Sequence, residues 1–215
     1  MININTSNIF IPKTSGQTKY LEALRSTKSV SLCTGPAGTG KTLFACQEAV
    51  LAFNEDRYKK IIMTRPTVGV DEDLGYLPGD INDKMTPWMQ PINDILLNYF
   101  SVYEIERLKT RDLIEILPLA HIRGRTLDNA IIIADEAQNA TINQTKTLMT
   151  RIGNDSKMVL IGDTTQVDIE NSGLIDLIER IAVSDNLEYI EHINMNHEDV
   201  QRHPAIKEIL SLYEM

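Results

Sequence analysis

The sequence has little cysteine, few aromatic residues and no long apolar run, and each shortage excludes a class of protein. Its two cysteines, Cys33 and Cys46, show no spacing typical of a disulfide framework or a zinc site. No stretch approaches the roughly 18 apolar residues of a membrane span, and the first residues lack the basic start and apolar run of a signal peptide. We therefore expect a reduced, cytoplasmic protein that neither enters a membrane nor is secreted.

The chain also lacks an overall basic charge, with 21 Lys and Arg against 30 Asp and Glu among 215 residues. The imbalance is uneven, because residues 1–125 carry 15 basic and 14 acidic side chains whereas residues 126–215 carry 6 and 16. A net acidic protein does not condense on nucleic acid indiscriminately, so any such binding needs a local basic patch. The length suits one domain that buries about 70% of the surface its unfolded chain exposes.

Short β-rich runs alternate with helical patterns, which predicts an α/β fold in which a parallel sheet is sandwiched between helices. We expect strands at residues 29–34, 60–64, 114–117, 131–134, 158–161 and 187–192. We expect helices at residues 14–26, 42–53, 141–151, 172–183 and 204–212. Residues 66–100 interrupt this rhythm with four prolines and the only tryptophan, Trp88, and predict an insertion that ends in a helix at about residues 87–99.

Residues 35–42 carry the strongest motif, Gly-Pro-Ala-Gly-Thr-Gly-Lys-Thr, which satisfies G-x4-G-K-[ST] between a predicted strand and a predicted helix. Glycines let backbone N–H groups surround a phosphate, and a helix N-terminus adds partial positive charge. We expect Lys41 to reach the β- and γ-phosphates of a nucleotide and the Thr42 hydroxyl to bind Mg²⁺. The predicted nucleotide-binding residues of this loop are Gly35, Pro36, Ala37, Gly38, Thr39, Gly40, Lys41 and Thr42.

A second motif, Asp135-Glu136, ends an apolar run and so places two carboxylates at the carboxyl edge of the sheet, where ligands bind in such folds. Asp135 would hold Mg²⁺ through its water shell, and Glu136 would polarise an attacking water as a general base. Alone, such a pair also serves as a helix N-cap followed by a first-turn acid. Together with the phosphate loop upstream, the pair favours an NTP hydrolase.

A third element follows the apolar run at residues 158–161 and contains Gln166. The amide of Gln166 can both donate and accept, so it could contact the γ-phosphate and the attacking water at once. A turn rich in Asp and Thr with a surface glutamine has the same composition, and that alternative stays open.

In this order the three motifs resemble the motor domain of superfamily 1 helicases, and further motifs narrow the resemblance. These are residues 17–20 (QTKY), 64–66 (TRP), 74–80 (LGYLPGD), 123–127 (RGRTL) and 202–204 (RHP). Together they look like the PhoH-like family of predicted ATPases, over about residues 17–209. The resemblance implies a single RecA-like P-loop NTPase domain over residues 1–215, with ATP and Mg²⁺ as its cofactors.

The resemblance also implies roles outside the phosphate loop. Gln17 would read the adenine edge with Tyr20 nearby, unless Gln17 is a helix-surface residue. Arg65, Arg123 and Arg125 would contact single-stranded RNA or DNA, and for these three a structural ion pair is the open alternative.

Arg202 is the candidate arginine finger. A lone RecA-like domain leaves one side of the γ-phosphate open to water, and related enzymes close that side with an arginine. If Arg202 acts in trans, subunits must join head to tail, and we expect a homo-oligomeric ring, a hexamer. A helix-capping or surface ion-pair role is the alternative.

The sequence thus predicts Mg²⁺-dependent ATP hydrolysis coupled to single-stranded RNA or DNA, with Lys41, Glu136, Gln166 and Arg202 as catalytic residues. A nucleotide-dependent interaction module that hydrolyses slowly would carry the same residues. A small-molecule phosphotransferase needs only the metal-binding Asp, so Glu136 argues against it. A GTPase is disfavoured because the sequence has no N-K-x-D guanine-reading motif.

Overall fold

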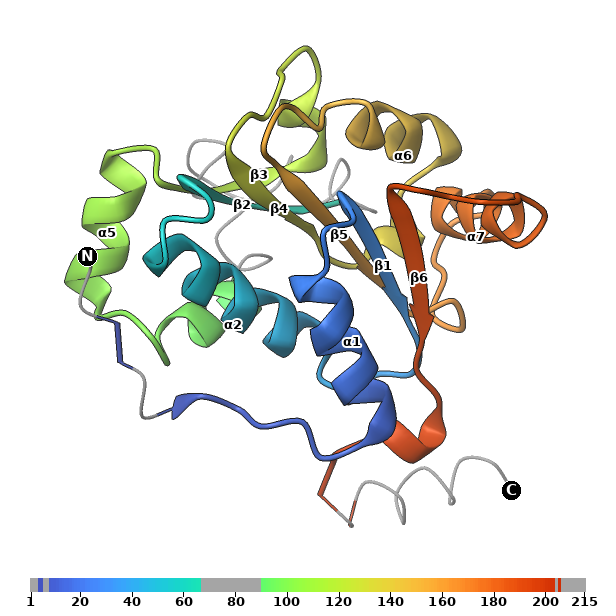
Figure 1. Ribbon diagram of the computed structural model, residues 1–215, viewed down its shortest axis with the longest axis horizontal. Coiled ribbons are helices and arrows are strands. Elements are labelled where there is room, and N and C mark those ends of the chain that lie inside the picture. The colour runs from blue at the N-terminus through green and yellow to red at the C-terminus, as the bar shows by residue number, and fades with distance from the viewer. Residues whose placement is uncertain (1–3, 6–7, 67–89, 204, 206–215) are drawn as a thin grey trace, which may run out of the picture.

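A parallel β-sheet between two layers of helices forms the centre of the molecule, as a computed structural model shows (Figure 1). The structure describes residues 4–5, 8–66, 90–203 and 205. In order across the sheet, the strands of this part are β3 (Ile114–Pro118), β2 (Lys60–Arg65), β4 (Ala130–Ala134), β5 (Lys157–Gly162), β1 (Val30–Thr34) and β6 (Ile190–Asn194). Each neighbouring pair is parallel, so the predicted α/β fold class is confirmed.

Successive residues of the central strands face opposite helical layers. Ile131 and Ile133 of β4 join one apolar cluster, whereas Ile132 joins the other. Because both faces are covered, these strands appear in the sequence as continuous apolar runs instead of alternating ones. Two groups of helices cover the faces in Figure 1: α1 (Ser15–Arg25), α2 (Lys41–Asn54) and α5 (Val102–Thr110) on one, and α6 (Ile142–Met149) and α7 (Gly173–Ala182) on the other.

Helix starts follow the capping residues of the sequence. Thr14, Thr141 and Ser172 each accept a hydrogen bond from a backbone N–H of the first turn of α1, α6 and α7, respectively. The helices predicted from these positions are therefore confirmed. In the described parts of the chain, no helix is long and apolar enough to cross a membrane.

Two elements differ from the sequence prediction. Strand β6 begins at Ile190 and not at residue 187, because Ile190 is the first residue that pairs with β1, opposite Val30. Helix α5 was not predicted, although Ser101 and Glu104 form a capping box at its start. A serine followed three residues later by a glutamate was therefore the sequence signal for the start of α5.

The predicted insertion is described only from residue 90 onward. Residues 90–96 are helical, and Ile92, Leu96 and Tyr99 are buried in the core that α2 also joins. The rest of the predicted insertion at residues 67–89, which includes Trp88, lies outside the described residues. So does most of the helix predicted at residues 204–212.

All the strands run in one direction, so their carboxyl ends meet at one edge of the sheet. Thr34 of β1 pairs with Gly162 of β5, and Thr64 of β2 pairs with Ala134 of β4. The residues that follow these positions therefore lie along the same edge, although they are far apart in the sequence. This edge positions the candidate site.

Candidate functional site

The loop of residues 35–42 joins β1 to α2 and has the shape of a phosphate-binding loop. Gly38 and Gly40 have φ angles of +84° and +87°, a left-handed conformation that residues with a side chain rarely adopt. Gly40 precedes α2, and within the described chain no side chain caps this helix. The N–H groups of its first turn are therefore left to an anion, which the positive end of the helix dipole also favours.

Lys41 opens α2 and turns its ammonium group back over the loop. Its Nζ donates hydrogen bonds to the carbonyl oxygens of Gly35 at 2.7 Å and Pro36 at 2.8 Å. Burial lowers the pKa of this amine from its usual value, against the opposing attraction of nearby acids. The loop, Lys41 and the acids Asp135 and Glu136 line one cavity of about 310 Å³.

Thr42 links this loop to the acidic end of β4. Its Oγ1 donates a hydrogen bond to Oδ1 of Asp135 at 2.9 Å. The backbone N–H of Asp135 donates to the carbonyl of Thr64 on β2 at 2.9 Å, so the sheet itself fixes the position of this carboxylate. The two residues predicted to bind the metal are thus brought together.

Glu136 differs sharply from its neighbour Asp135 in environment. The side chain of Asp135 is 3% exposed, whereas that of Glu136 is 46% exposed. Glu136 also has a φ angle of +53°, which is uncommon for a residue with a side chain and costs on the order of 1–3 kcal/mol. One carboxylate is therefore buried against the loop, and the other opens into the cavity.

Gln138 orients Glu136, and its role was missed from the sequence. Its Nε2 donates to Oε2 of Glu136 at 2.7 Å, and its Oε1 accepts from the backbone N–H of Asp163 at 3.1 Å. The same Nε2 also donates to the carbonyl of Gln166 at 3.1 Å, and Gln138 is itself buried, with 1% exposure. The position of Gln138, shortly after the acid pair, was the only signal in the sequence.

Asp163 and Gln166 lie in the turn after β5. Gln166 donates its Nε2 to Oδ2 of Asp163 at 3.0 Å, and the same oxygen accepts from the backbone N–H of Ala37 in the loop at 3.1 Å. Gln166 and Glu136 line both the cavity at the loop and a second cavity of about 630 Å³ beyond it. The structure thus brings the predicted Gln166 to the side of the predicted base.

Arg65, the last residue of β2, turns toward the acid pair. Its Nη2 lies 2.9 Å from Oδ2 of Asp135 and 3.3 Å from Oε1 of Glu136, and its side chain is only 14% exposed. Of the two interpretations left open by the sequence, this geometry matches the ion pair. Arg65 also lines the second cavity.

Gln17 lies buried against the phosphate loop. Its Nε2 donates to the carbonyl of Thr39 at 3.0 Å, and its Oε1 accepts from the backbone N–H of Lys13 at 2.8 Å. Both ends of the amide are thus engaged within the chain and connect α1 to the loop. Tyr20, expected nearby, is fully buried in the apolar core beneath α1.

Arg202 lies on the phosphate loop of its own chain. A methyl group placed on Gly38 would overlap the side chain of Arg202, and the backbone N–H of Gln201 donates to the Gly38 carbonyl at 2.9 Å. Asp199 anchors this segment, because its carboxylate accepts from the backbone N–H of Gly16 at 3.0 Å. The structure therefore places Arg202 beside the loop of its own chain.

The remaining predicted nucleic-acid residues lie apart from the acid pair in the described structure. Arg125 forms an ion pair with Glu115 of β3 at 2.7 Å, and Arg123 is exposed. Tyr76 and Trp88 of the predicted insertion lie outside the described residues.

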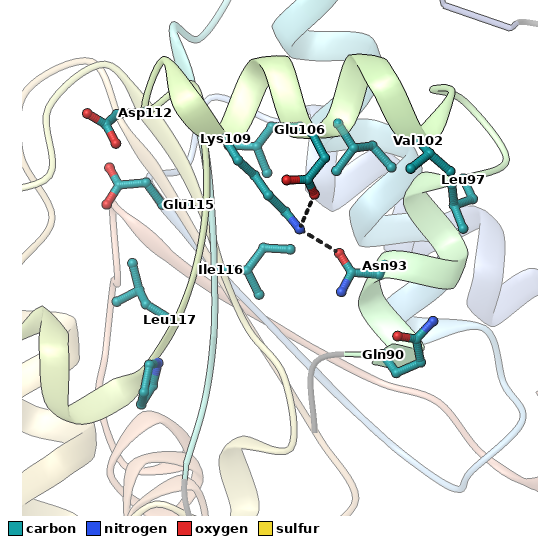
Figure 2. Close-up of a pocket in the computed structure, with 13 residues that line it drawn as sticks. Gln90, Asn93, Leu97, Val102, Glu106, Lys109, Asp112, Glu115, Ile116 and Leu117 are labelled. Atoms are coloured by element: carbon teal, nitrogen blue, oxygen red, sulfur yellow. Dashed lines mark hydrogen bonds and ion pairs between the residues drawn. The ribbon is translucent and has the colours of Figure 1, made fainter. Parts of the chain in front are cut away.

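A separate cavity of about 660 Å³ lies between residues 90–97, α5 and β3 (Figure 2). Lys109 contacts Glu106, one turn earlier on α5, at 3.3 Å, and reaches across the cavity to Asn93 at 3.4 Å. Besides Glu106, it is lined by two further carboxylates, those of Asp112 and Glu115. This charge is unsuited to phosphates, so the nucleotide is better assigned to the loop cavity.

The fold and the site together define a RecA-like P-loop nucleotide-binding domain. A family model described as "PhoH-like protein" matches residues 9–214. The chain therefore belongs to the PhoH-like family, as its motifs predicted. It is 43% identical over 205 residues to a PhoH-like protein of Bacillus subtilis (strain 168), and 36% identical over 208 residues to Protein PhoH of Escherichia coli (strain K12).

These relatives are longer than the chain. Each match covers 94% of this chain but only 63% of the Bacillus protein and 58% of the Escherichia coli protein. Among solved structures, the large terminase of a thermophilic bacteriophage matches 94% of this chain and 50% of its own with a TM-score of 0.51 and 14% identity. The Pif1 helicase of Candida albicans matches 95% and 44%, with a TM-score of 0.47 and 15% identity. At these identities the terminase shows a shared fold alone.

Proposed function

We propose that the chain binds ATP at the loop of residues 35–42 and hydrolyses it with Mg²⁺. One observation carries the proposal, namely the 2.9 Å hydrogen bond from the Thr42 hydroxyl to Asp135. It joins the phosphate loop to the acid pair, so a metal-bound phosphate and the predicted base Glu136 would share one cavity. Membership of the PhoH-like family, whose motifs resemble those of P-loop ATPases, also supports an ATPase.

The donor set fits Mg²⁺. A hydroxyl oxygen and a carboxylate oxygen are hard ligands, and Mg²⁺ is usually held by one or two carboxylates together with phosphates and waters. When bound, the ion would neutralise charge on the phosphate oxygens, with Thr42 and Asp135 holding it.

The other residues would bind phosphate and move the proton. Lys41 would exchange its loop carbonyl partners for phosphate oxygens, and Arg202 would neutralise charge that develops on the γ-phosphate. Glu136 would accept the proton of the attacking water, which Gln166 would orient. The open position of Glu136 and the burial of Asp135 suit these separate tasks.

Gln138 is expected to position Glu136 for this proton transfer. Gln138→Leu removes all three hydrogen bonds of the amide while it keeps a side chain of similar size. The kcat for phosphate release should fall by about 10- to 100-fold with KM changed little. Gln90→Leu, at an exposed position that lines a separate cavity, serves as the control. An unchanged kcat in Gln138→Leu would show that this amide does not orient the base.

We further propose that single-stranded RNA or DNA stimulates this hydrolysis. The order of motifs resembles that of helicase motor domains, and the second cavity adjoins Glu136 and Gln166 on the side away from the loop. The net acidic chain would make few phosphate contacts, so binding should be weak and should weaken further with salt.

The test compares ATP turnover with and without single-stranded RNA and DNA oligonucleotides at low salt. The proposal predicts a faster phosphate release with oligonucleotide and loss of that gain as salt rises. If neither ATP turnover nor gel mobility changes with the oligonucleotide, the nucleic-acid part alone is contradicted.

A slow nucleotide-dependent interaction module is the second candidate, and the contacts of Arg65 with both acids favour it.

A further inference from the structure

We propose that Arg65 is an internal gate on the metal site, because its guanidinium and a divalent cation compete for the same carboxylate. The gate deepens the proposed function and rests on it, since it controls the Thr42 and Asp135 oxygens assigned to Mg²⁺. In the structure, Nε and Nη2 of Arg65 lie 3.2 and 2.9 Å from Oδ2 of Asp135. The Thr42 hydroxyl holds Oδ1 at 2.9 Å, so both carboxylate oxygens are engaged.

The sheet makes this competition part of the fold. Arg65 ends β2 and Asp135 follows β4, and these strands are neighbours in register. The Asp135 carboxylate is nearly buried and the guanidinium is 14% exposed, so the ion pair is weakly screened by water. A flexible surface arginine would be displaced at little cost. Arg65, in contrast, makes charge-assisted hydrogen bonds to both Asp135 and Glu136.

Metal binding at Asp135 and the present contact of Arg65 exclude each other. A cation held by this carboxylate would lie within a few ångströms of the guanidinium, and like charges at that distance in a partly buried site repel strongly. The protein must therefore move Arg65 from Asp135 before the metal is held there. The observed metal affinity is the intrinsic affinity multiplied by the fraction of molecules in which Arg65 has left Asp135.

The surroundings give the displaced guanidinium a place to go. Arg65 lines the cavity of about 630 Å³ together with Glu136 and Gln166. Its Nη2 already contacts Oε1 of Glu136 at 3.3 Å, so the charge keeps a partner as it leaves Asp135. The same movement changes the contacts of the proposed base, which couples loading of the metal to readiness for hydrolysis.

The experiment measures binding of Mn²⁺, as a probe of the Mg²⁺ site, to the nucleotide-free full chain by electron paramagnetic resonance. Arg65→Gln should bind Mn²⁺ on the order of tenfold more tightly than the unaltered protein. Adding Asp135→Asn to this variant should abolish the gain. Arg180→Gln removes an equal charge from an exposed ion pair on α7 and should leave Mn²⁺ affinity unchanged.

Arg65→Lys keeps the test valid if Arg65→Gln does not fold, because it retains a cation but loses the two-pronged contact. We expect a folded protein by circular dichroism with Mn²⁺ bound about threefold more tightly than in the unaltered chain. Mn²⁺ affinity that stays equal or weakens in the folded Arg65 variants overturns the gate. A gain that survives Asp135→Asn would also overturn it, because the gain would then come from another site.

Nucleotide binding separates this proposal from the proposed function. Fluorescent ATP analogue binding is measured in parallel on the unaltered chain and on Arg65→Gln. If the unaltered chain binds no nucleotide, the proposed function fails whatever the Mn²⁺ result. If nucleotide binds but Mn²⁺ affinity is the same in both proteins, the gate alone fails.

Discussion

Glu136→Gln is expected to reduce ATP turnover by about 100-fold or more while nucleotide affinity changes less than about threefold. General-base catalysis contributes on this scale, and an amide of the same size cannot accept the proton. The substitution leaves in place Lys41 and Asp135, the residues proposed to bind phosphate and metal. Phosphate release and fluorescent nucleotide binding, measured on the same preparation, separate the two quantities.

Glu179→Gln is the matched control, because Glu179 is an exposed residue of α7 on the other helical layer. It should leave both turnover and nucleotide affinity unaltered. Full turnover in Glu136→Gln would rule out this residue as the base.

Arg202→Ala is expected to lower ATP turnover by about 1,000-fold, and mixing it with Lys41→Ala subunits should restore no activity. The magnitude follows from other arginine fingers, and the absence of recovery follows from the contact of Arg202 with Gly38 of its own loop. In a Lys41→Ala subunit the arginine is present but the loop is impaired. Neither subunit of the mixture then holds a complete site.

Partial recovery of ATP turnover in the mixture would contradict action in cis and would support a ring of subunits joined head to tail. Arg180→Ala, at an exposed ion pair on α7, controls for loss of a surface arginine. The geometric reason for expecting a hexamer was a finger acting in trans, so sizing the protein by light scattering, with and without nucleotide, is an independent measurement of assembly.

The fold could be predicted largely from the sequence because its signals are local. Short apolar runs predicted the central strands, and helical patterns predicted three helices whose starts the structure places at the caps Thr14, Thr141 and Ser172. The start of β6 was wrong because it depends on pairing with β1, which a single apolar run does not encode. Helix α5 was missed although its capping box was present.

The site was predictable as a set of residues but not as a set of contacts. Spacing indicated the loop, Asp135 and Gln166, since each follows a strand. The direction of Arg65 depends on β2 lying beside β4, and the contact of Arg202 with the loop depends on where the chain returns after β6. Such long-range arrangements leave no mark in a local pattern. The position of Gln138 after the acid pair did not by itself indicate its contacts with Asp163 and Gln166, which follow β5.

The decisive measurement for ATP hydrolysis at this loop is phosphate release from ATP by the purified full chain, in parallel with Lys41→Ala prepared identically. We expect the unaltered chain to bind nucleotide and to release phosphate only with Mg²⁺, and Lys41→Ala to lose both binding and release. Phosphate release equal in the two proteins, or none above buffer in the unaltered chain with and without oligonucleotide, would contradict ATP hydrolysis at this loop.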